Sequence, residues 1–352
     1  MKAALDEPVA DPGRLHADAL RVRAAIEQHR DEVADLLGTR NRSVIFTSGA
    51  TESITAAVWG AAQRCERVAY AMVEHSAVRS ASDRWFPSDG VTVLPVDGTG
   101  RIDPEAVTPV VAGGPALIHV QWVNHEVGTT QPVAEIVDAA RAGGALVHVD
   151  AAQAAGRIPI DVDELGADLL SASAHKLGGP AGLGVLVVRR GLRLPPLLQG
   201  GAQERNRRAG LENIPAIAGL GAVAAALDRS RLEHEHQQVA ALSRRLRSGL
   251  ARLPGVRAHG DPDHALPHIV SVGIEGLEPQ AVLLRLDRAG VSAHSGSACA
   301  GEDLEPSPVL RAMGLEADRS LRLSLGWSST DADVDAVLDA LPDVLDRLRR
   351  LG

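Results

Sequence analysis

The sequence predicts an α/β fold: a large domain built on a mostly parallel seven-stranded sheet flanked by helices, followed by a smaller C-terminal α+β domain. Short apolar, strand-like runs alternate with helical stretches up to about Gly201, which is typical of a parallel sheet covered on both faces. Beyond that point the alternation stops, and a long helical region leads into more widely spaced elements. We therefore expect residues 14–230 to form the large domain and residues 231–352 the smaller one, with residues 1–13 extended.

Apolar periodicity and stop signals define the elements of the large domain. Apolar residues recur at intervals of three and four from Arg14 to Leu37, which predicts a helix that ends at Gly38. Further helices are predicted over Thr51–Ala62 and Val133–Ala142. The predicted strands are short apolar runs: Ser43–Thr47, Arg67–Met72, Val91–Val96, Ala116–Val123, Ala145–Asp150, Ala167–Ala174 and Gly184–Val188.

The smaller domain follows a helical region that extends roughly from Ile214 to Leu253 and stops at a Pro-Gly pair. Its other elements are supplied by the segments Ile269–Val272, Pro279–Ala289 and Ser320–Leu325. From Asp331 to Leu351 the apolar residues recur with a helical period, which predicts an amphipathic helix at the C-terminus.

The composition excludes several classes of protein. The 352 residues are 45% hydrophobic and 23% charged, as expected for a globular protein with room for two domains. Aromatic residues make up 2% and the net charge is −9, so neither base stacking nor a basic surface for nucleic acid is expected. Cys65 and Cys299 do not form a disulfide framework, and no long apolar run marks a signal peptide or a membrane span. We expect a protein of the reducing cytoplasm.

Lys176 is the first candidate for a chemical role. It follows an apolar strand and precedes two glycines and a proline, within the run SASAHKLGGP at positions 171–180. Lysine is rarely buried without a function, because its ammonium group is costly to desolvate. A lysine held among small residues can act as an amine nucleophile and form a Schiff base. A surface lysine at a turn explains the same residues.

Other chemically useful side chains follow other predicted strands, where parallel sheets bind their ligands. The segment 47–52 reads TSGATE and opens a helix, so its backbone N–H groups suit a phosphate, although a plain N-cap also fits. His75 offers an imidazole that could stack on a flat ligand or move protons. Asp150 ends a strand with Gln153 three residues on; a buried carboxylate suits a protonated ring nitrogen, and an N-cap is the alternative.

Three further features complete the set of candidates. Asn124, His125 and Glu126 form a polar cluster at a strand end, but a metal site there would lack a third ligand at a suitable spacing, so we expect no metal. Cys299 lies among Gly, Ser and Ala, which indicates an exposed, mobile and unpaired thiol. Arg322 lies within an alternating strand, where it either clamps a substrate carboxylate or faces solvent.

Together these residues meet the needs of an enzyme that uses pyridoxal phosphate on a sulfur-containing amino acid. From about Asp11 to its C-terminus the chain resembles the cysteine desulfurases, in the class V aminotransferase branch of fold-type I pyridoxal-phosphate enzymes. The SGSAC form, continued by LEPS, resembles the subgroup with a long cysteine loop. The matching motifs occur in order: FTSGATES (46–53), EH (74–75), VNHEVG (123–128), HVDAAQAAG (148–156), SASAHKLGGPAGLG (171–184), SGSACAGEDLEPSPVLRAMG (295–314) and LRLSLG (321–326).

The resemblance implies a role for each candidate that binds the cofactor. Lys176 would hold pyridoxal 5'-phosphate in a Schiff base and move protons, and His75 would stack on its ring and share in the catalytic proton transfers. Asp150 would pair with the ring nitrogen and Gln153 would reach the ring hydroxyl. The group that would bind the cofactor near its phosphate comprises Ala50, Thr51, Ser173 and His175.

The implied reaction converts L-cysteine to L-alanine. Asn124 and Arg322 would hold the substrate carboxylate, and Cys299 would take up the sulfur as a persulfide. A homodimer that passes this sulfur to an acceptor protein of unknown identity is expected. Two alternatives remain: another class V enzyme, such as a C–S or selenocysteine lyase, and a degenerate, non-catalytic protein that binds a sulfur acceptor.

Two departures from the family's pattern bear on how well the cofactor is held. The family begins with a strand and a turn of the form YLDNAATT that walls the active site, whereas this sequence starts after that point. The family's RAGTEN loop supplies a threonine to the phosphate of the neighbouring subunit, and Leu211 stands there in this chain. One charge-assisted hydrogen bond, worth roughly 1.5–3 kcal/mol, would be missing, which predicts weaker cofactor retention.

Overall fold

The computed structural model describes residues 1–6, 10–295 and 306–351. Its larger sheet contains seven strands in the order β1-β7-β6-β5-β4-β2-β3. Neighbouring strands run parallel except at β7, which is antiparallel to both β1 and β6. The predicted mostly parallel sheet is therefore confirmed, and its strands have these bounds: β1 Val44–Thr47, β2 Val68–Ala71, β3 Val91–Leu94, β4 Leu117–Gln121, β5 Leu146–Asp150, β6 Leu169–Ser173 and β7 Gly184–Val188.

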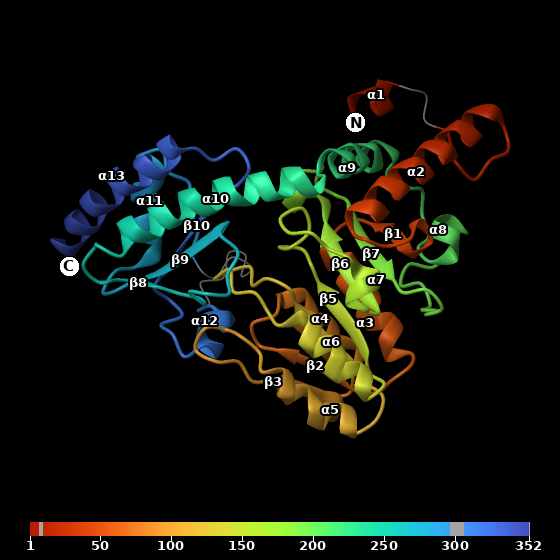
Figure 1. Cartoon of the computed structure of the whole chain (residues 1–352), viewed down its shortest axis with the longest axis horizontal. Coiled ribbons are helices and arrows are strands. Elements are labelled where there is room, and N and C mark those ends of the chain that lie inside the picture. Colours follow the sequence, from red (N-terminus) through yellow and green to blue (C-terminus); the bar gives the residue numbers. More distant parts are fainter. Residues whose placement is uncertain (7–9, 296–305, 352) are drawn as a thin grey trace.

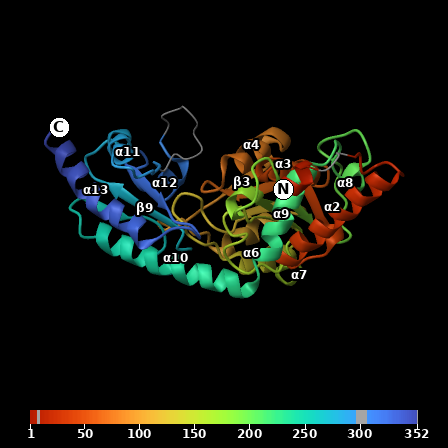
Figure 2. The same ribbon diagram turned by 90° about the horizontal axis from the view of Figure 1, so that it is seen from above.

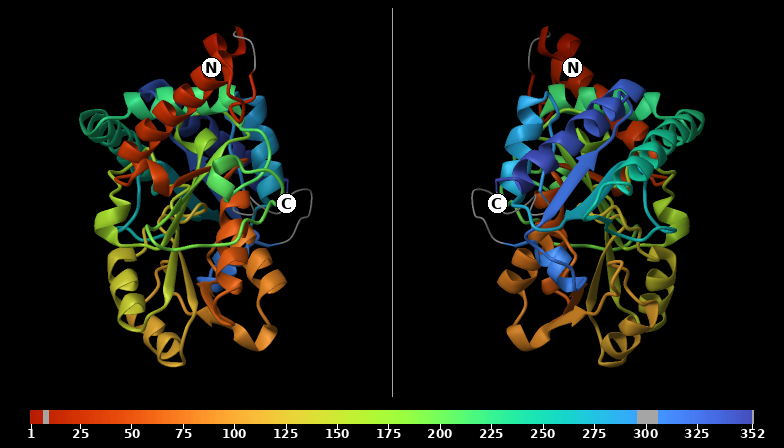
Figure 3. Two further views of the ribbon diagram at one scale, coloured as in Figure 1. Left: turned by 90° about the vertical axis from the view of Figure 1, so that its right-hand side faces the viewer. Right: turned by 90° about the vertical axis from the view of Figure 1, so that its left-hand side faces the viewer.

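Helices cover both faces of this sheet, as its apolar strands require. The helices α3 and α4 lie on one face and α6 lies on the other (Figure 3). The helix α2 packs against α9. The helices of this part are α2 Ala17–Leu36, α3 Ala50–Ala62, α4 Ser76–Trp85, α5 Thr108–Ala112, α6 Val133–Ala142, α7 Val162–Leu165, α8 Gln203–Asn206 and α9 Ile214–Ala226. Short 3-10 turns are formed by Asn41–Ser43, Ser88–Gly90, Pro104–Val107 and Ala174–Leu177.

A second, three-stranded antiparallel sheet in the order β10-β9-β8 lies at the other end of the molecule (Figure 1). The long helix α10 runs between the two ends and contacts β9 and α13 (Figure 2). None of the helices in the described ranges is long and apolar enough to cross a membrane. The elements of this part are α10 Arg229–Leu250, β8 Val256–Ala258, β9 Ile269–Ile274, α11 Pro279–Arg288, α12 Pro308–Ala312, β10 Ser320–Ser324 and α13 Asp331–Arg349.

The molecule contains two main apolar cores, and the chain does not divide between them at one point. The second core draws its buried residues from between Val239 and Leu345. The first core is built mainly from the seven-stranded sheet and its helices, but it also contains Val309 and Leu310 of α12. A domain division between residues 230 and 231 would fall just inside α10, and that division stays a prediction.

Two local expectations are wrong. Residues 2–6 form a short helix, α1 (Lys2–Asp6), where we expected an extended segment. This helix contacts α9, and its alanines and leucine favour a helical backbone. The helical region expected from Ile214 to Leu253 is interrupted after Ala226, because the side chain of Asp228 accepts a hydrogen bond from Arg231 N and so caps the start of α10.

Candidate active site

Lys176 lies just beyond the carboxyl end of β6, in the 3-10 turn Ala174–Leu177. Gly178 ends this turn with a φ of 93°, a left-handed conformation that glycine adopts without strain. The carbonyl oxygen of Lys176 accepts a hydrogen bond from Arg157 Nη2 at 3.1 Å. The lysine residue is half-buried, so its side chain remains partly accessible.

Asp150 ends the neighbouring strand β5 and is 7% exposed. Its Oδ1 accepts a hydrogen bond from Ala152 N at 2.9 Å, which fixes the carboxylate at the start of the following turn. Asp150 and Lys176 both influence the titration of His75, so the three side chains share one electrostatic neighbourhood. The carboxyl ends of β6, β5 and β2, three strands of one sheet, therefore bring the predicted lysine, aspartate and histidine together.

His75 caps the N-terminus of α4, because its Nδ1 accepts a hydrogen bond from Ala77 N at 3.1 Å. Burial lowers the pKa of His75, Lys176 and Arg79 lower it further, and the Asp150 carboxylate opposes them. The imidazole is thus neutral with its proton on Nε2. Its ring lies edge-on to that of His125, with 5.3 Å between the ring centroids.

The candidate phosphate site lies where the N-terminus of α3 meets the end of β6. Gly184 pairs with Ser173 across β7 and β6, and a Cβ on Gly184 would come within 2.4 Å of the carbonyl carbon of Gly49. Gly49, the N-cap residue of α3, has no heavy atom within 4 Å of the position of its own missing Cβ. The helix terminus therefore faces open space. Ser173 Oγ lies 2.9 Å from His175 Nδ1, and Thr51 is exposed in the first turn of α3.

Asn124 and Arg322 meet at the loop after β4. Asn124 Oδ1 accepts hydrogen bonds from the backbone N–H groups of Glu126 and Val127 at 2.8 and 2.9 Å. Its Nδ2 donates to Val73 O at 3.0 Å. Arg322, on β10 of the second sheet, donates from Nη1 to His125 O at 3.0 Å. Asn124 is thus fixed within this loop, and Arg322 is held against the loop by its bond to His125 O.

The side chains of His125 and Glu126, where we expected no metal, contact each other and Ser307. Glu126 Oε2 accepts a hydrogen bond from Ser307 Oγ at 2.6 Å, while its Oε1 lies 3.7 Å from His125 Nε2. Burial raises the pKa of Glu126 to about 7. No group of three or more His, Cys, Asp or Glu side chains suited to a metal ion occurs in the part of the chain that the structure describes.

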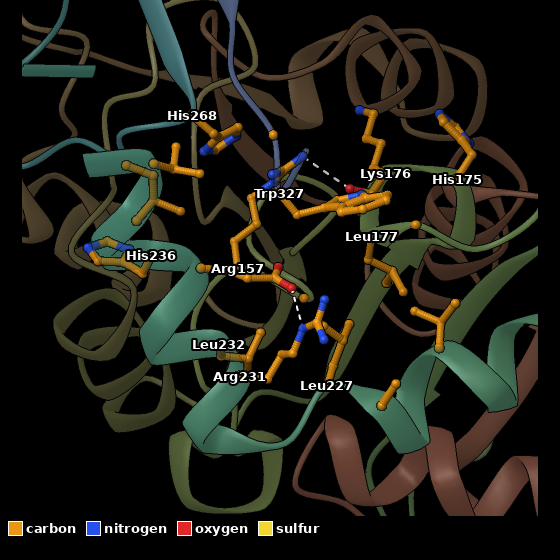
Figure 4. Close-up of a pocket in the computed structure, with 18 of the residues that line it drawn as sticks. Arg157, His175, Lys176, Leu177, Leu227, Arg231, Leu232, His236, His268 and Trp327 are labelled. Carbon is orange, nitrogen blue, oxygen red and sulfur yellow. Dashed lines mark hydrogen bonds and ion pairs between the residues drawn. The ribbon is translucent and has the colours of Figure 1, made fainter. Parts of the chain in front are cut away.

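A cavity of about 530 Å³ opens beside Lys176 and His175 (Figure 4). Its walls come from the turn after β6, from α9 and α10, and from the loops around β9 and β10. His75, Asp150 and Asn124 do not line it, so the cavity adjoins the polar cluster rather than containing it. Its labelled polar and aromatic wall residues are Arg157, His175, Lys176, Arg231, His236, His268 and Trp327.

Sequence patterns did not identify His268, which contacts one of the predicted cofactor-binding residues. His268 is 5% exposed and its Nε2 lies 3.2 Å from Gln153 Oε1. The two residues are 115 positions apart, and nothing in the local sequence LPHIV distinguishes this histidine from the chain's 12 others. The predicted Cys299 lies outside the described residues.

The family follows from comparison with known proteins. The model of the family "Aminotransferase class-V" matches residues 10–337. The protein "Cysteine desulfurase IscS" of Methanosarcina thermophila is 38% identical over 99% of this chain and 88% of its own length. The chain belongs to the cysteine desulfurase family of class-V aminotransferases.

Solved structures of cysteine desulfurase relatives share the architecture. A NifS-like protein superposes with a TM-score of 0.90 at 29% identity, covering 99% of this chain and 94% of that protein. The protein SspA, solved in complex with cysteine, gives a TM-score of 0.78 at 30% identity, covering 94% and 96% of the two chains. The predicted family and the fold-type I architecture are both confirmed.

The family implies pyridoxal phosphate, and the described residues fit this group. The open space at Gly49 lies at the N-terminus of a 13-residue helix, where backbone N–H groups favour a phosphate. Buried Asp150 offers a carboxylate for a protonated ring nitrogen. The buried Arg157 Nε near Lys176 has no hydrogen-bond partner among the described residues, and its hydrogen suits an anionic acceptor. The polar groups of the site therefore match an anionic, nitrogen-containing ligand.

Proposed function

We propose that this chain is a pyridoxal-phosphate-dependent cysteine desulfurase that converts L-cysteine to L-alanine and forms a persulfide on Cys299. The observation that carries the proposal is the meeting of Lys176, Asp150 and His75 at the carboxyl ends of strands of one sheet, in a chain 38% identical to a curated cysteine desulfurase. The reaction balances without an oxidant: the substrate C–S bond breaks, a proton replaces sulfur on the carbon, and the sulfur joins the Cys299 thiol.

Each residue near the cofactor would have one task. Bound pyridoxal phosphate supplies an electron sink for the carbon that bears the substrate's amino group. Lys176 would hold the cofactor covalently and, once released by substrate, would carry protons with its amine. Asp150 would keep the ring nitrogen protonated, and neutral His75 would stack on the ring. Gln153 would donate to the ring hydroxyl oxygen. The phosphate would bind at Ala50, Thr51, Ser173 and His175.

Substrate binding would use the two residues at the loop after β4. The amide nitrogen of Asn124 carries two hydrogens, and Val73 O takes one, so the other suits a carboxylate oxygen. The guanidinium of Arg322 would supply the charge-assisted part of the same contact. Because Arg322 comes from the second sheet and Asn124 from the first, the substrate carboxylate would bridge the two parts of the molecule.

The deciding experiment is incubation of the purified protein with L-cysteine and pyridoxal phosphate, with and without a thiol reductant. We expect L-alanine in both cases, sulfide release when reductant is present, and one added sulfur atom on Cys299 by mass spectrometry when it is absent. Cys299→Ser should retain the visible absorbance of bound cofactor but lose the persulfide. Absence of cofactor absorbance and of alanine in the wild type would refute the proposal.

The assembly and location follow the family's pattern and are also proposals. We propose a homodimer in the cytoplasm that hands its sulfur to an acceptor protein. Leu198 and Leu211, on either side of α8 in the sequence, are 42% and 51% exposed, and we propose that they face the partner. Light scattering on the purified protein at several concentrations measures the oligomeric state, and a constant monomer mass would exclude the dimer.

A further inference from the structure

His268 and Gln153 form a side-chain contact between the two parts of the molecule. His268 directly precedes β9 of the second sheet, whereas Gln153 lies in the turn after β5 of the first. The distance from His268 Nε2 to Gln153 Oε1 is 3.2 Å. The backbone of His268 is itself fixed, because its carbonyl oxygen accepts a hydrogen bond from Leu325 N at 2.9 Å.

The contact defines which nitrogen of the imidazole carries the proton. Burial lowers the pKa of His268 well below its usual value, and the nearby charges of Arg157, Lys176, Arg322 and His236 add to this effect. The ring is therefore neutral and has one N–H group. An amide oxygen only accepts, so the N–H group must be Nε2–H, and Nδ1 is left as a bare acceptor without a partner among the described residues.

The same contact orients the Gln153 amide, because its oxygen is the atom that faces His268 Nε2. With Oε1 occupied by His268, the NH2 group of Gln153 points the other way and has hydrogens to donate. Without the imidazole N–H, the amide could turn about its terminal bond and present oxygen in place of nitrogen. An oxygen facing the anionic ring oxygen of a bound cofactor would repel it.

We propose that His268 is a positioning residue that holds the Gln153 amide with its nitrogen toward the ring oxygen of pyridoxal phosphate. This proposal rests on the proposed function, because Gln153 meets the cofactor only if the cofactor binds at Lys176. Since His268 directly precedes β9 of the second sheet, the placement of the donor to the ring oxygen also depends on how the two parts of the molecule pack together.

A first test needs no cofactor. Nitrogen-15 NMR of histidine-labelled apo-protein distinguishes the two neutral tautomers of an imidazole, and the signal of His268 is identified by its loss in His268→Gln. We expect a neutral Nε2–H tautomer across neutral pH. A neutral Nδ1–H tautomer would overturn the proposal whether or not the protein binds pyridoxal phosphate.

A second test follows the bound cofactor. A donor on the ring oxygen lowers the pH at which the Schiff-base proton is lost, because it stabilises the negative charge left on that oxygen. In His268→Leu we therefore expect the pH midpoint of the cofactor's visible absorbance change to rise by about 0.5–1 unit. Pyridoxal phosphate should also bind about 3–10-fold more weakly. His268→Gln places an amide N–H near the position of Nε2 and should restore the midpoint to within about 0.3 pH unit and the affinity to within about twofold of wild type.

The controls separate positioning from general damage. His259 is another buried histidine of the second part of the chain, and its Nδ1 lies 3.4 Å from Ser271 Oγ. His259→Leu should lower stability without moving the absorbance midpoint. Gln153→Leu should raise the midpoint, and adding His268→Leu to it should raise it no further. An unchanged midpoint in His268→Leu would overturn the positioning role alone, whereas a wild type without cofactor absorbance would overturn the proposed function as well.

Discussion

Asp150 is the residue whose charge we expect to matter most for the reaction. Its carboxylate is buried and fixed by Ala152 N, so it can face a ring nitrogen without reorganising. Asp150→Asn keeps the shape but removes the charge. We predict a loss of about 10–100-fold in the rate of alanine formation, since a hydrogen bond to a charged group contributes about 1.5–3 kcal/mol. The rate should be measured at saturating L-cysteine and pyridoxal phosphate.

Asp168 provides the matched control for this substitution. It is also buried, but it accepts hydrogen bonds from Arg189 Nε at 2.7 Å and from Val147 N at 2.8 Å, near the starts of the strands rather than at their ends. Asp168→Asn should lower the unfolding free energy and leave the catalytic rate per folded molecule near wild type. Equal rate losses in both variants would contradict a specific role for Asp150.

Leu211→Thr tests our expectation that this chain lacks one hydrogen bond to the cofactor phosphate. The side chain is half-exposed, so Leu211→Thr disturbs no core. If the loop meets a phosphate in a dimer, the added hydroxyl should tighten pyridoxal-phosphate binding by about tenfold or more, as one charge-assisted hydrogen bond allows. Leu198→Thr, at a comparably exposed leucine, is the control. Equal affinity of Leu211→Thr and wild type, measured by fluorescence titration, would count against this account.

Local sequence was enough to find most of the clustered side chains, because each lies at the carboxyl end of a predicted strand. Lys176, Asp150 and His75 were found in this way, and the sheet order brings their strand ends together. The role of His75 as the cap of α4 was not foreseen, since caps are usually Ser, Thr, Asp or Asn. His268 could not be found, because its contact depends on how the second sheet packs against the first.

At the scale of elements, α8 has an unusual backbone that its side chains stabilise. Glu204, Arg205 and Asn206 have φ values of 47°, 58° and 62°, a left-handed run that costs roughly 1–2 kcal/mol for each residue without glycine. Glu204 offsets this cost with a buried bidentate ion pair to Arg30, at 2.6 and 2.8 Å. It also accepts a hydrogen bond from Phe46 N at 3.0 Å, which ties the loop to β1.

This arrangement predicts a large stability effect at α8. Glu204→Gln removes the buried counter-charge of the Arg30 guanidinium and leaves it only the exposed carboxylate of Glu27, so we expect the free energy of unfolding to fall by about 3–5 kcal/mol. Glu27 also pairs with Arg30 but is 39% exposed, and Glu27→Gln should cost no more than about 1 kcal/mol. Urea denaturation of both variants measures the difference. Similar losses of unfolding free energy in the two variants would show that the burial of an ion pair does not determine how much it stabilises the fold.

The bounds of the elements were predicted best where a strong pattern coincided with a clear stop. The helix α6 was predicted with the bounds that the structure gives it, and β1 and β7 were predicted to within one residue at each end. The short strand β8 and the five-residue helix α12 were not foreseen, because segments of this length have too few residues to establish a period.

For the whole molecule, buried carboxyl groups predict how stability depends on pH. Burial raises the pKa of Glu74 to about 8, with a contribution from Asp150, and burial raises that of Glu126 to about 7. In the unfolded chain such groups titrate near pH 4.3. The folded state therefore binds more protons between these values, so its stability is greatest at the acidic end of this range and falls as the pH rises toward 8.

Glu74→Gln tests this dependence. In the wild type, Gln121 N donates a hydrogen bond to Glu74 Oε1 at 2.8 Å. The amide oxygen of the new glutamine can accept the same bond. Relative to wild type its unfolding free energy should improve by up to about 1.4 kcal/mol for each pH unit between about 5 and 8. Urea denaturation of the apo-protein at three pH values gives these differences. Exposed Glu66 provides the control, and Glu66→Gln should show no such trend.

The placement of α12 has a consequence for how the protein is made. The first core is completed by Leu266, Val309, Leu310 and Met313, which are synthesised long after the seven strands of the large sheet. A nascent chain that has emerged only as far as α10 would expose the apolar surface that these side chains cover. The sheet can therefore form during translation, but its core closes only near the end of synthesis. Until then a ribosome-bound chain should depend on chaperones to keep that surface from aggregating.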